Sequence, residues 1–356
     1  MESLRGLAAI YVLIHHAKWL LSESYSLRKS SVIDFNYVLT KLFVPFRFGH
    51  EAVIFFFILS GFVIHYSSSK GLGTQNLNIL SYLKKRVNRI FPPLILALLI
   101  TLVFDFFGKN VLRLGAYSFG SKYYSLIVDN LNLEAFLGNV FLLQELNAGV
   151  KHLGSNAALW SLSYEWWFYL IYPIFFTINR KNKLVAFCIQ ILLYLIVSFL
   201  IPIAIPIVNP IFTKMLIWWF GVVIADLYLS KSKILPYLSV FLIGIPIAIV
   251  FFDRHKLVGD IFWGLGFLGL MATLLSLNPR NPFILFLNKI KSIGSYSYTL
   301  YLIHVPVIFM AYAILLEVNK GKLPETYLYV FLMTIICIVI SKFLSSKIEK
   351  VIFFKL

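Results

Sequence analysis

Residues 5–16 read Arg-Gly-Leu-Ala-Ala-Ile-Tyr-Val-Leu-Ile-His-His, an apolar run with an arginine at its start and two histidines at its end. On a helix that rises about 1.5 Å per residue, Arg5 and His16 lie about 16 Å apart along the axis on roughly the same face. An ionisable side chain inside a lipid-spanning helix costs about 2.5 kcal/mol or more, so it is a hypothesis for a functional site. The stretch therefore predicts a first membrane span that carries part of such a site.

The composition of the whole chain supports a membrane protein. Hydrophobic residues make up 60% of the 356 residues and charged residues only 13%, which is more apolar surface than one soluble domain can bury. Cys188 and Cys337 lie within apolar runs without metal-type spacing, so we expect neither a disulfide framework nor a metal site. The N-terminus lacks the pattern of a cleaved signal peptide, so the first span is expected to remain. The predicted fold is therefore an all-α polytopic membrane protein.

Hydropathy predicts about ten spans of the length that a hydrocarbon core of about 30 Å requires. They lie near residues 4–21, 50–66, 91–108, 159–177, 184–207, 211–228, 234–252, 257–276, 293–316 and 326–345. The net charge of +17 gathers in the short loops on one side, which the positive-inside rule places in the cytoplasm together with both termini. We therefore interpret the basicity as topology, expect no nucleic-acid partner, and expect one integral-membrane domain over residues 1–356 with no appended soluble domain.

The second predicted span begins with His50-Glu51 and later contains Ser60-Gly61. Small residues such as Ser60 and Gly61 let a neighbouring helix approach closely, and we favour this role over contact with a ligand. An exposed His-Glu pair at a membrane edge would be unremarkable. The same pair would matter if it faced the cavity that contains His16.

Four cations precede a pair of prolines in Lys84-Lys85-Arg86-Val87-Asn88-Arg89-Ile90-Phe91-Pro92-Pro93, which we place in a loop that leads into the third span. Lys84 and Lys85 fit a topology signal with contacts to lipid headgroups. Arg86 and Arg89 would share one face of a helical turn, and two guanidinium groups can bind phosphates bidentately. This pair predicts a phosphorylated donor on the cytoplasmic side.

The longest non-spanning region, residues 109–158, contains an apolar part near residues 131–143 that predicts an interfacial or re-entrant helix. An acceptor site in this region rests on its position alone. Glu165 follows in the fourth span, about 9 Å below the outer edge by helical rise. A buried carboxylate needs a partner, and by depth His16 is one candidate for it; a structural carboxylate bound by Ser or Tyr hydroxyls is the equally favoured alternative.

Five motifs in order resemble the bacterial integral-membrane acyltransferases known as acyltransferase family three. They are SLRGLAAIYVLIHH at 3–16, FFFILSGFVI at 55–64, KRVNRIFPP at 85–93, LWSLSYEWWFYLIYP at 159–173 and GSYSYTLYLIH at 294–304. The resemblance covers nearly the whole chain. It implies an O-acyltransferase that modifies lipopolysaccharide O-antigens, exopolysaccharides or related envelope molecules in the bacterial cytoplasmic (inner) membrane.

The resemblance also implies roles for single residues. Arg5 and His16 match the essential arginine and histidine of the family, Arg86 and Arg89 match its acyl-coenzyme A pair, and Glu165 matches its Ser-x-x-x-Glu carboxylate, with Ser161 in the serine position. His304 falls in its late Tyr-Leu-x-His motif. Some members carry a histidine just before Trp-Ser-Leu; here Ala157, Ala158 and Leu159 precede Trp160, so that role is absent or taken by another group such as His152.

The expected reaction moves an acyl group, with acetyl as the expected group, from cytoplasmic acyl-coenzyme A to a hydroxyl of an envelope glycan or glycolipid. His16, Arg5 and Glu165 are the expected catalytic residues, and Arg86, Arg89 and Arg5 the expected donor-binding residues. His15, Ser161, His304, His50 and Glu51 are secondary candidates; His15 points about 100° away from His16 on a helix, which favours His16. A transporter or flippase, and a non-catalytic scaffold, are the alternatives.

Overall fold

The computed structural model describes residues 1–22, 35–70, 77–144, 146, 149–200, 208–251, 256–324, 326–348, 351 and 353–354, and no strand occurs among them. The helices are α1 (Glu2–Leu21), α2 (Phe35–Phe43), α3 (Gly49–Ser69), α4 (Ile79–Phe106), α5 (Tyr124–Ile127), α6 (Leu133–Val140), α7 (Trp160–Lys181), α8 (Lys183–Leu195), α9 (Val208–Leu229), α10 (Gly244–Val250), α11 (Lys256–Ser276), α12 (Pro282–Lys289), α13 (Ser297–Val318) and α14 (Leu328–Ile348). Short 3₁₀ and π segments extend or join them: η2 (Phe107–Val111), η3 (Gly115–Tyr117), η4 (Ala157–Leu159), η5 (Ile196–Leu200), η6 (Leu235–Ile243) and η7 (Lys291–Ser295). The all-α prediction is confirmed for the described part of the chain.

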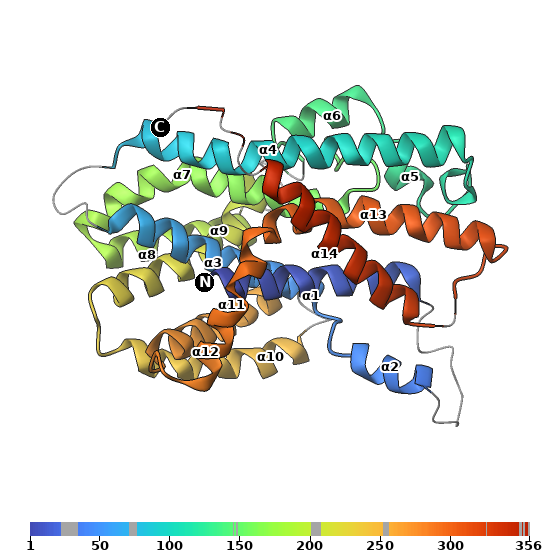
Figure 1. Ribbon diagram of the computed structural model, residues 1–356. Helices are drawn as coiled ribbons and strands as arrows, with labels where there is room; N and C mark the ends of the chain where they lie inside the picture. Colours follow the sequence, from blue (N-terminus) through green and yellow to red (C-terminus); the bar gives the residue numbers. More distant parts are fainter. Residues whose placement is uncertain are drawn as a thin grey trace.

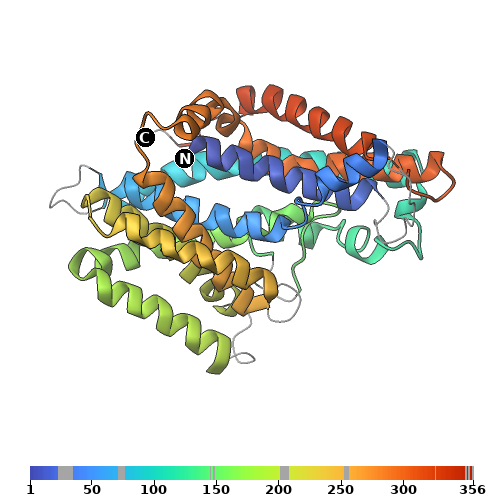
Figure 2. The same cartoon turned by 90° about the horizontal axis from the view of Figure 1, so that it is seen from below.

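The long helices form a bundle in which α1 packs against α3, α13 and α14 (Figure 1). Helices α1 and α13 run in the same direction, because Arg5 contacts Ser297 near the start of α13 and His16 contacts His304 about two to three turns further along. Helices α8 and α14 lie on opposite outer sides of the bundle (Figure 2). Both expose large apolar side chains, such as Leu192 and Phe343, as expected for a surface that faces lipid.

Two glycines set the distance between α3 and α9. A Cβ atom added to Gly61 would lie 2.1 Å from the carbonyl oxygen of Trp218, and one added to Gly221 would lie 2.1 Å from the carbonyl oxygen of Ile58. The two backbones therefore pack directly on each other, which no larger residue allows. This geometry agrees with the packing role expected for Gly61.

Six helical segments have the length and composition of a membrane span among the described residues. They are Gly49–Ser69, Ile79–Val111, Ile211–Leu229, Val258–Ser276, Ser297–Val318 and Leu328–Ile348. Helices α1 and α7 are also long, but they carry more polar and aromatic side chains. The predicted spans near 184–207 and 234–252 correspond to shorter apolar segments, Lys183–Phe199 and Leu235–Val250, and residues 201–207 and 252 lie outside the described part. A multi-pass membrane protein is supported; the count of ten spans and the cytoplasmic termini stay predictions.

Helix α4 begins earlier than predicted. Its N-terminus is capped by Asn78, whose side chain accepts a hydrogen bond from the Ser81 amide at 2.9 Å, and the helix continues through Pro92 and Pro93. The prolines do not start the helix, so the prediction of a loop around Arg86 and Arg89 is wrong. Both arginines lie on a helical turn, which fixes their relative positions.

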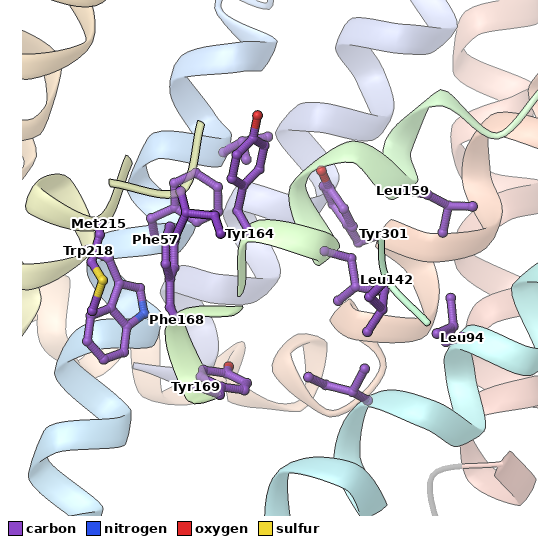
Figure 3. Packing of buried hydrophobic residues seen from close by; sticks show 14 of the residues in the cluster. Phe57, Leu94, Leu142, Leu159, Tyr164, Phe168, Tyr169, Met215, Trp218 and Tyr301 are labelled. Atoms are coloured by element: carbon purple, nitrogen blue, oxygen red, sulfur yellow. The ribbon is translucent and has the colours of Figure 1, made fainter. Parts of the chain in front are cut away.

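Aromatic side chains from several helices meet in the core between α3, α7, α9 and α13 (Figure 3). Phe168 on α7 lies with its ring centroid 5.5 Å from that of Phe57 on α3 and 5.9 Å from that of Trp218 on α9. Phe168 and Trp218 are fully buried. Close aromatic packing of this kind holds the helices that carry the polar site in fixed register.

Candidate functional site

A cavity of about 510 Å³ lies between α1, α3, α4, α7 and α13, and several of the predicted site residues line it. These are Arg5, Arg86, Arg89, Ser161 and Glu165. Much of the remaining wall is the apolar and aromatic face of α3. A concave, mostly apolar site with a few convergent charged groups is typical of a ligand pocket.

The guanidinium group of Arg5 is held by the start of α13. Its Nε donates to Ser297 Oγ at 3.2 Å, and its Nη2 donates to the Gly294 carbonyl at 3.0 Å. Gly294 allows this approach because a Cβ atom there would lie 2.5 Å from the Glu2 carbonyl oxygen. The Nε and Nη2 groups of Arg5 therefore hold its guanidinium at the cavity wall.

Arg86 and Arg89 line the same cavity from α4. The Arg86 guanidinium lies 5.5 Å from the ring centroid of Tyr82 and 5.8 Å from that of Tyr169, and its buried Nε has no hydrogen-bond partner among the described residues. Arg5, Arg86 and Arg89 form no ion pair with a carboxylate of the described residues. Because an unsatisfied buried donor is costly, Arg86 is set up to bind an anionic group.

Glu165 does not contact His16, so the partner suggested by depth is wrong, and its contacts are those of the alternative, Ser and Tyr hydroxyls. Its Oε1 accepts a hydrogen bond from Ser60 Oγ at 2.9 Å and another from the Tyr169 hydroxyl. Ser60 and Tyr169 also lie 3.0 Å apart, oxygen to oxygen. Glu165 therefore shares the cavity with the arginines, and Ser60 takes part in this polar network besides the packing of its neighbour Gly61.

The buried start of α7 explains this error. The Asn156 side-chain amide donates to the Leu302 carbonyl of α13 at 2.9 Å and to Thr101 Oγ1 of α4 at 3.1 Å. Asn156 is fully buried. Helix α7 therefore begins inside the bundle, and counting residues from a membrane edge misplaces Glu165.

Asp105 holds the turn before this start. Its Oδ2 accepts from the Ser155 amide at 2.7 Å, and its Oδ1 accepts from the Tyr117 hydroxyl at 2.9 Å. Gly154 has φ +49°, and a Cβ atom there would lie 2.2 Å from Asp105 Oδ2. Glycine is therefore required where the loop passes the carboxylate.

His16 pairs with His304 instead. His16 Nδ1 lies 2.8 Å from His304 Nε2, and His304 Nδ1 lies 2.7 Å from the Tyr301 carbonyl oxygen. A carbonyl only accepts, so His304 Nδ1 carries the proton and its Nε2 accepts from His16 Nδ1. This network leaves the lone pair on His16 Nε2 available as a base or nucleophile.

Tyr301 joins this histidine pair to the cavity. Its side chain lines the cavity, its hydroxyl lies 2.7 Å from Ser161 Oγ, and its ring centroid is 5.8 Å from that of His304. The ring of Phe56, another cavity residue, lies 5.5 Å from Tyr301. Figure 3 shows Tyr301 among the buried side chains of the core.

The secondary candidates separate into different places. His15 contacts the Phe46 carbonyl through Nδ1 at 3.1 Å, and His50 Nε2 lies 2.9 Å from Asp260 Oδ1. Glu51 is buried, but neither it nor His50 lines the cavity. His152, in the loop before α7, is half-buried, and burial followed by the charge of Lys151 lowers the pKa of its imidazole to about 4.

Two ionic clusters, of which only that of Asp260 is largely buried, were missed by sequence reasoning. Asp260 binds His50 and Lys214, while Asp226 lies 3.2 Å from His65 Nε2 and 2.8 Å from Lys183 Nζ. The residues of each cluster are far apart in the sequence, so no sequence motif predicts their contacts. Tyr169 was also missed, although its distance of four residues from Glu165 on a helix was a usable signal.

Fold and site define a multi-pass helical membrane protein that has an arginine-lined cavity beside a histidine pair. Residues 1–342 match the family described as an acyltransferase domain, so the chain belongs to acyltransferase family three.

Two relatives are similar at low identity. The O-acetyltransferase OatA of Staphylococcus aureus is 24% identical over 98% of this chain and 57% of its own length. An O-acetyl transferase of Shigella phage Sf6 is 26% identical over 47% of each chain. The chain therefore spans about half the length of the curated relatives it matches. No solved structure matches it.

Proposed function

We propose that the protein moves an acyl group, in the first instance acetyl, from acyl-coenzyme A to a hydroxyl of an envelope sugar, polysaccharide or glycolipid. The observation that carries this proposal is one cavity with three guanidinium groups, which have no ion-pair partner among the described residues, and a tyrosine wall next to an oriented histidine pair. The relatives named O-acetyltransferase support the same reaction class. The site would lie in the bacterial cytoplasmic membrane, with the Arg86 end and both termini in the cytoplasm.

The three arginines bind the phosphates of the donor in this proposal. Guanidinium groups match phosphate oxygens bidentately, and the unpartnered Nε of Arg86 would gain an acceptor on binding. Arg5 and His16 are about 16 Å apart along α1, so an extended pantetheine arm can place the thioester near the histidines while the phosphates stay at the arginines.

His16 carries the proton in the transfer step. Its Nε2 takes the proton of the acceptor hydroxyl, the oxygen attacks the thioester carbonyl, and the carbon–sulfur bond breaks. The proton on His16 then passes to the leaving thiolate, so the products are an ester and free coenzyme A. A two-step route, in which Nε2 first takes the acyl group, uses the same nitrogen. In both routes His304 holds the proton on His16 Nδ1.

The test uses full-length protein in native membranes with radiolabelled acetyl-coenzyme A, followed by extraction of the envelope glycans. We expect alkali-labile label with the wild-type protein and a loss of about 10²–10⁴-fold in His16→Ala, the usual range for a missing general base. Donor binding should be retained, and Lys109→Gln, which changes an exposed lysine away from the cavity, should keep its label.

Wild-type transfer by His16→Ala would remove this residue from the mechanism. Glycan that crosses the membrane without acquiring label would instead favour the transporter alternative.

A further inference from the structure

A second cavity, of about 390 Å³, lies beyond the histidine pair, and no step of the proposed acyl transfer uses it. Residues 115–123, between α4 and α5, and the end of α13 line it, with Lys122, Tyr123, Tyr312, Glu317 and Lys320 among its side chains. Figure 1 shows α5 beside the C-terminal end of α13, at the same side of the bundle as the end of α1.

The position of this cavity continues the line of the proposed transfer path. Arg5 and Ser297 meet at the first cavity, and His16 and His304 meet further along the same two helices. Trp19 is one turn beyond His16, and Tyr312 is about 12 Å beyond His304 at helical rise. The ring centroids of Trp19 and Tyr123 are 5.9 Å apart. The histidine pair therefore lies between the two cavities along α1 and α13.

The charged groups of the second cavity are available for a ligand. Lys122 and Lys320 are exposed, and neither pairs with a carboxylate within the part of the chain that the structure describes. Glu317 also lines the cavity, but its Oε2 accepts a hydrogen bond from the Gly115 amide at 3.1 Å. Two ammonium groups that have no carboxylate partner among the described residues, beside a single carboxylate, leave a net positive charge that favours an anionic ligand.

The aromatic groups at its rim add a second recognition element. Lys122 Nζ lies 5.1 Å from the ring centroid of Tyr123 and 5.7 Å from that of Trp19. The Trp19 side chain is 57% exposed, although it is large and apolar. Sugar rings present apolar C–H faces that pack against aromatic rings, while their hydroxyls remain in water.

We propose that this second cavity binds an acidic sugar residue of the acceptor glycan, with its carboxylate at Lys122 and Lys320 and its ring against the aromatic rim. This inference rests on the proposed function, because it assigns the acceptor to the side of the histidine pair opposite to the arginines. It narrows the acceptor class to a glycan that contains uronic acid or a similarly charged sugar.

Binding is measured first, without any transfer. The full-length protein in phosphatidylcholine nanodiscs is titrated with a tetragalacturonate probe and with maltotetraose as the neutral counterpart. We expect salt-sensitive binding of the acidic probe only, weakened about tenfold or more in the double variant Lys122→Gln with Lys320→Gln, as for a lost charge-assisted hydrogen bond. Lys109→Gln, an exposed lysine outside both cavities, is the matched control.

Equal binding of both probes, or no effect of the double variant, overturns the proposal. Complete loss of acidic-probe binding in nanodiscs that contain phosphatidylglycerol, with the same dependence on Lys122 and Lys320, would assign the cavity to a lipid headgroup. That result would also overturn the proposal.

Kinetics separates this inference from the proposed reaction. With an acidic acceptor, the double variant should raise the acceptor KM about tenfold and leave the donor KM and kcat unchanged. If the double variant transfers the acyl group with an unchanged acceptor KM, acceptor binding at the second cavity is refuted and the proposed reaction still stands. Specific binding of the acidic probe by a protein that transfers no acyl group refutes the reaction and leaves the binding site intact.

Discussion

Cationic side chains occur in two different settings in this protein. In the cluster of Lys214, Asp260 and His50, the ammonium and imidazole groups bind the two oxygens of one carboxylate. In the first cavity, Arg5, Arg86 and Arg89 have no such partner among the described residues, and Glu165 is bound by hydroxyls instead. A charge that the fold neutralises holds helices together, whereas a charge left unpaired beside a cavity is available for a ligand.

The cluster around Asp226 extends the first kind of setting. Asp226 joins α9 to α3 through His65 and to α8 through Lys183, and it also accepts from the Asn179 amide at 2.8 Å. Every oxygen of this carboxylate has a donor from another helix. Together, the two clusters cross-link helices on both sides of the aromatic core.

The largest expected effect tests the paired setting. Lys214→Met leaves Asp260 with His50 alone and should destabilise the protein by about 3–5 kcal/mol, the usual cost of breaking a buried pair. Thermal unfolding in detergent should show a clear fall in Tm. The double variant Lys214→Met with Asp260→Leu removes both charges and should recover much of the loss; a single variant as stable as wild type would contradict the structural role.

The second prediction tests the unpaired setting. Arg86→Ala combined with Arg89→Ala should weaken binding of acetyl-coenzyme A by at least about 10–100-fold, because the loss of even one hydrogen bond to a charged group costs about 1.5–3 kcal/mol. The Tm should not fall, since no ion pair within the described residues is lost. Calorimetric titration measures the affinity, with Lys85→Ala, an exposed cation on the same turn, as the control. Unchanged donor affinity would remove the pair from the site.

The smallest of the three effects concerns His304, a positioning residue in this mechanism. His304→Leu removes the acceptor for the His16 Nδ1 proton and should lower kcat about 10–100-fold, as is typical when an orienting partner is lost. Donor affinity should stay the same. His304→Gln can still accept a hydrogen bond and should restore part of kcat; equal rates for the Leu and Gln variants would argue against a hydrogen-bonding role.

Sequence reasoning brought Arg5, Arg86, Arg89, Glu165 and Ser161 forward, and the structure places all five on one cavity. Short-range helical spacing explains the success for the arginine pair, since residues three apart share a face. The wrong prediction concerns the depth of Glu165 in the helix bundle. Glu165 was paired with His16 because its depth was counted from a membrane edge, whereas the polar contacts of Asn156 start α7 inside the bundle.

The sequence by itself determined the helical class, the polar residues that interrupt the apolar runs, and the family, because these depend on local composition and spacing. Only the tertiary structure decided that His16 pairs with His304, that Glu165 binds Ser60 and Tyr169, and that Asp260 takes Lys214. These partners are separated by long stretches of chain or share a helix with many other polar groups. Which groups meet depends on how backbones approach one another, as at Gly61 and Gly221, and that is a property of the packed bundle.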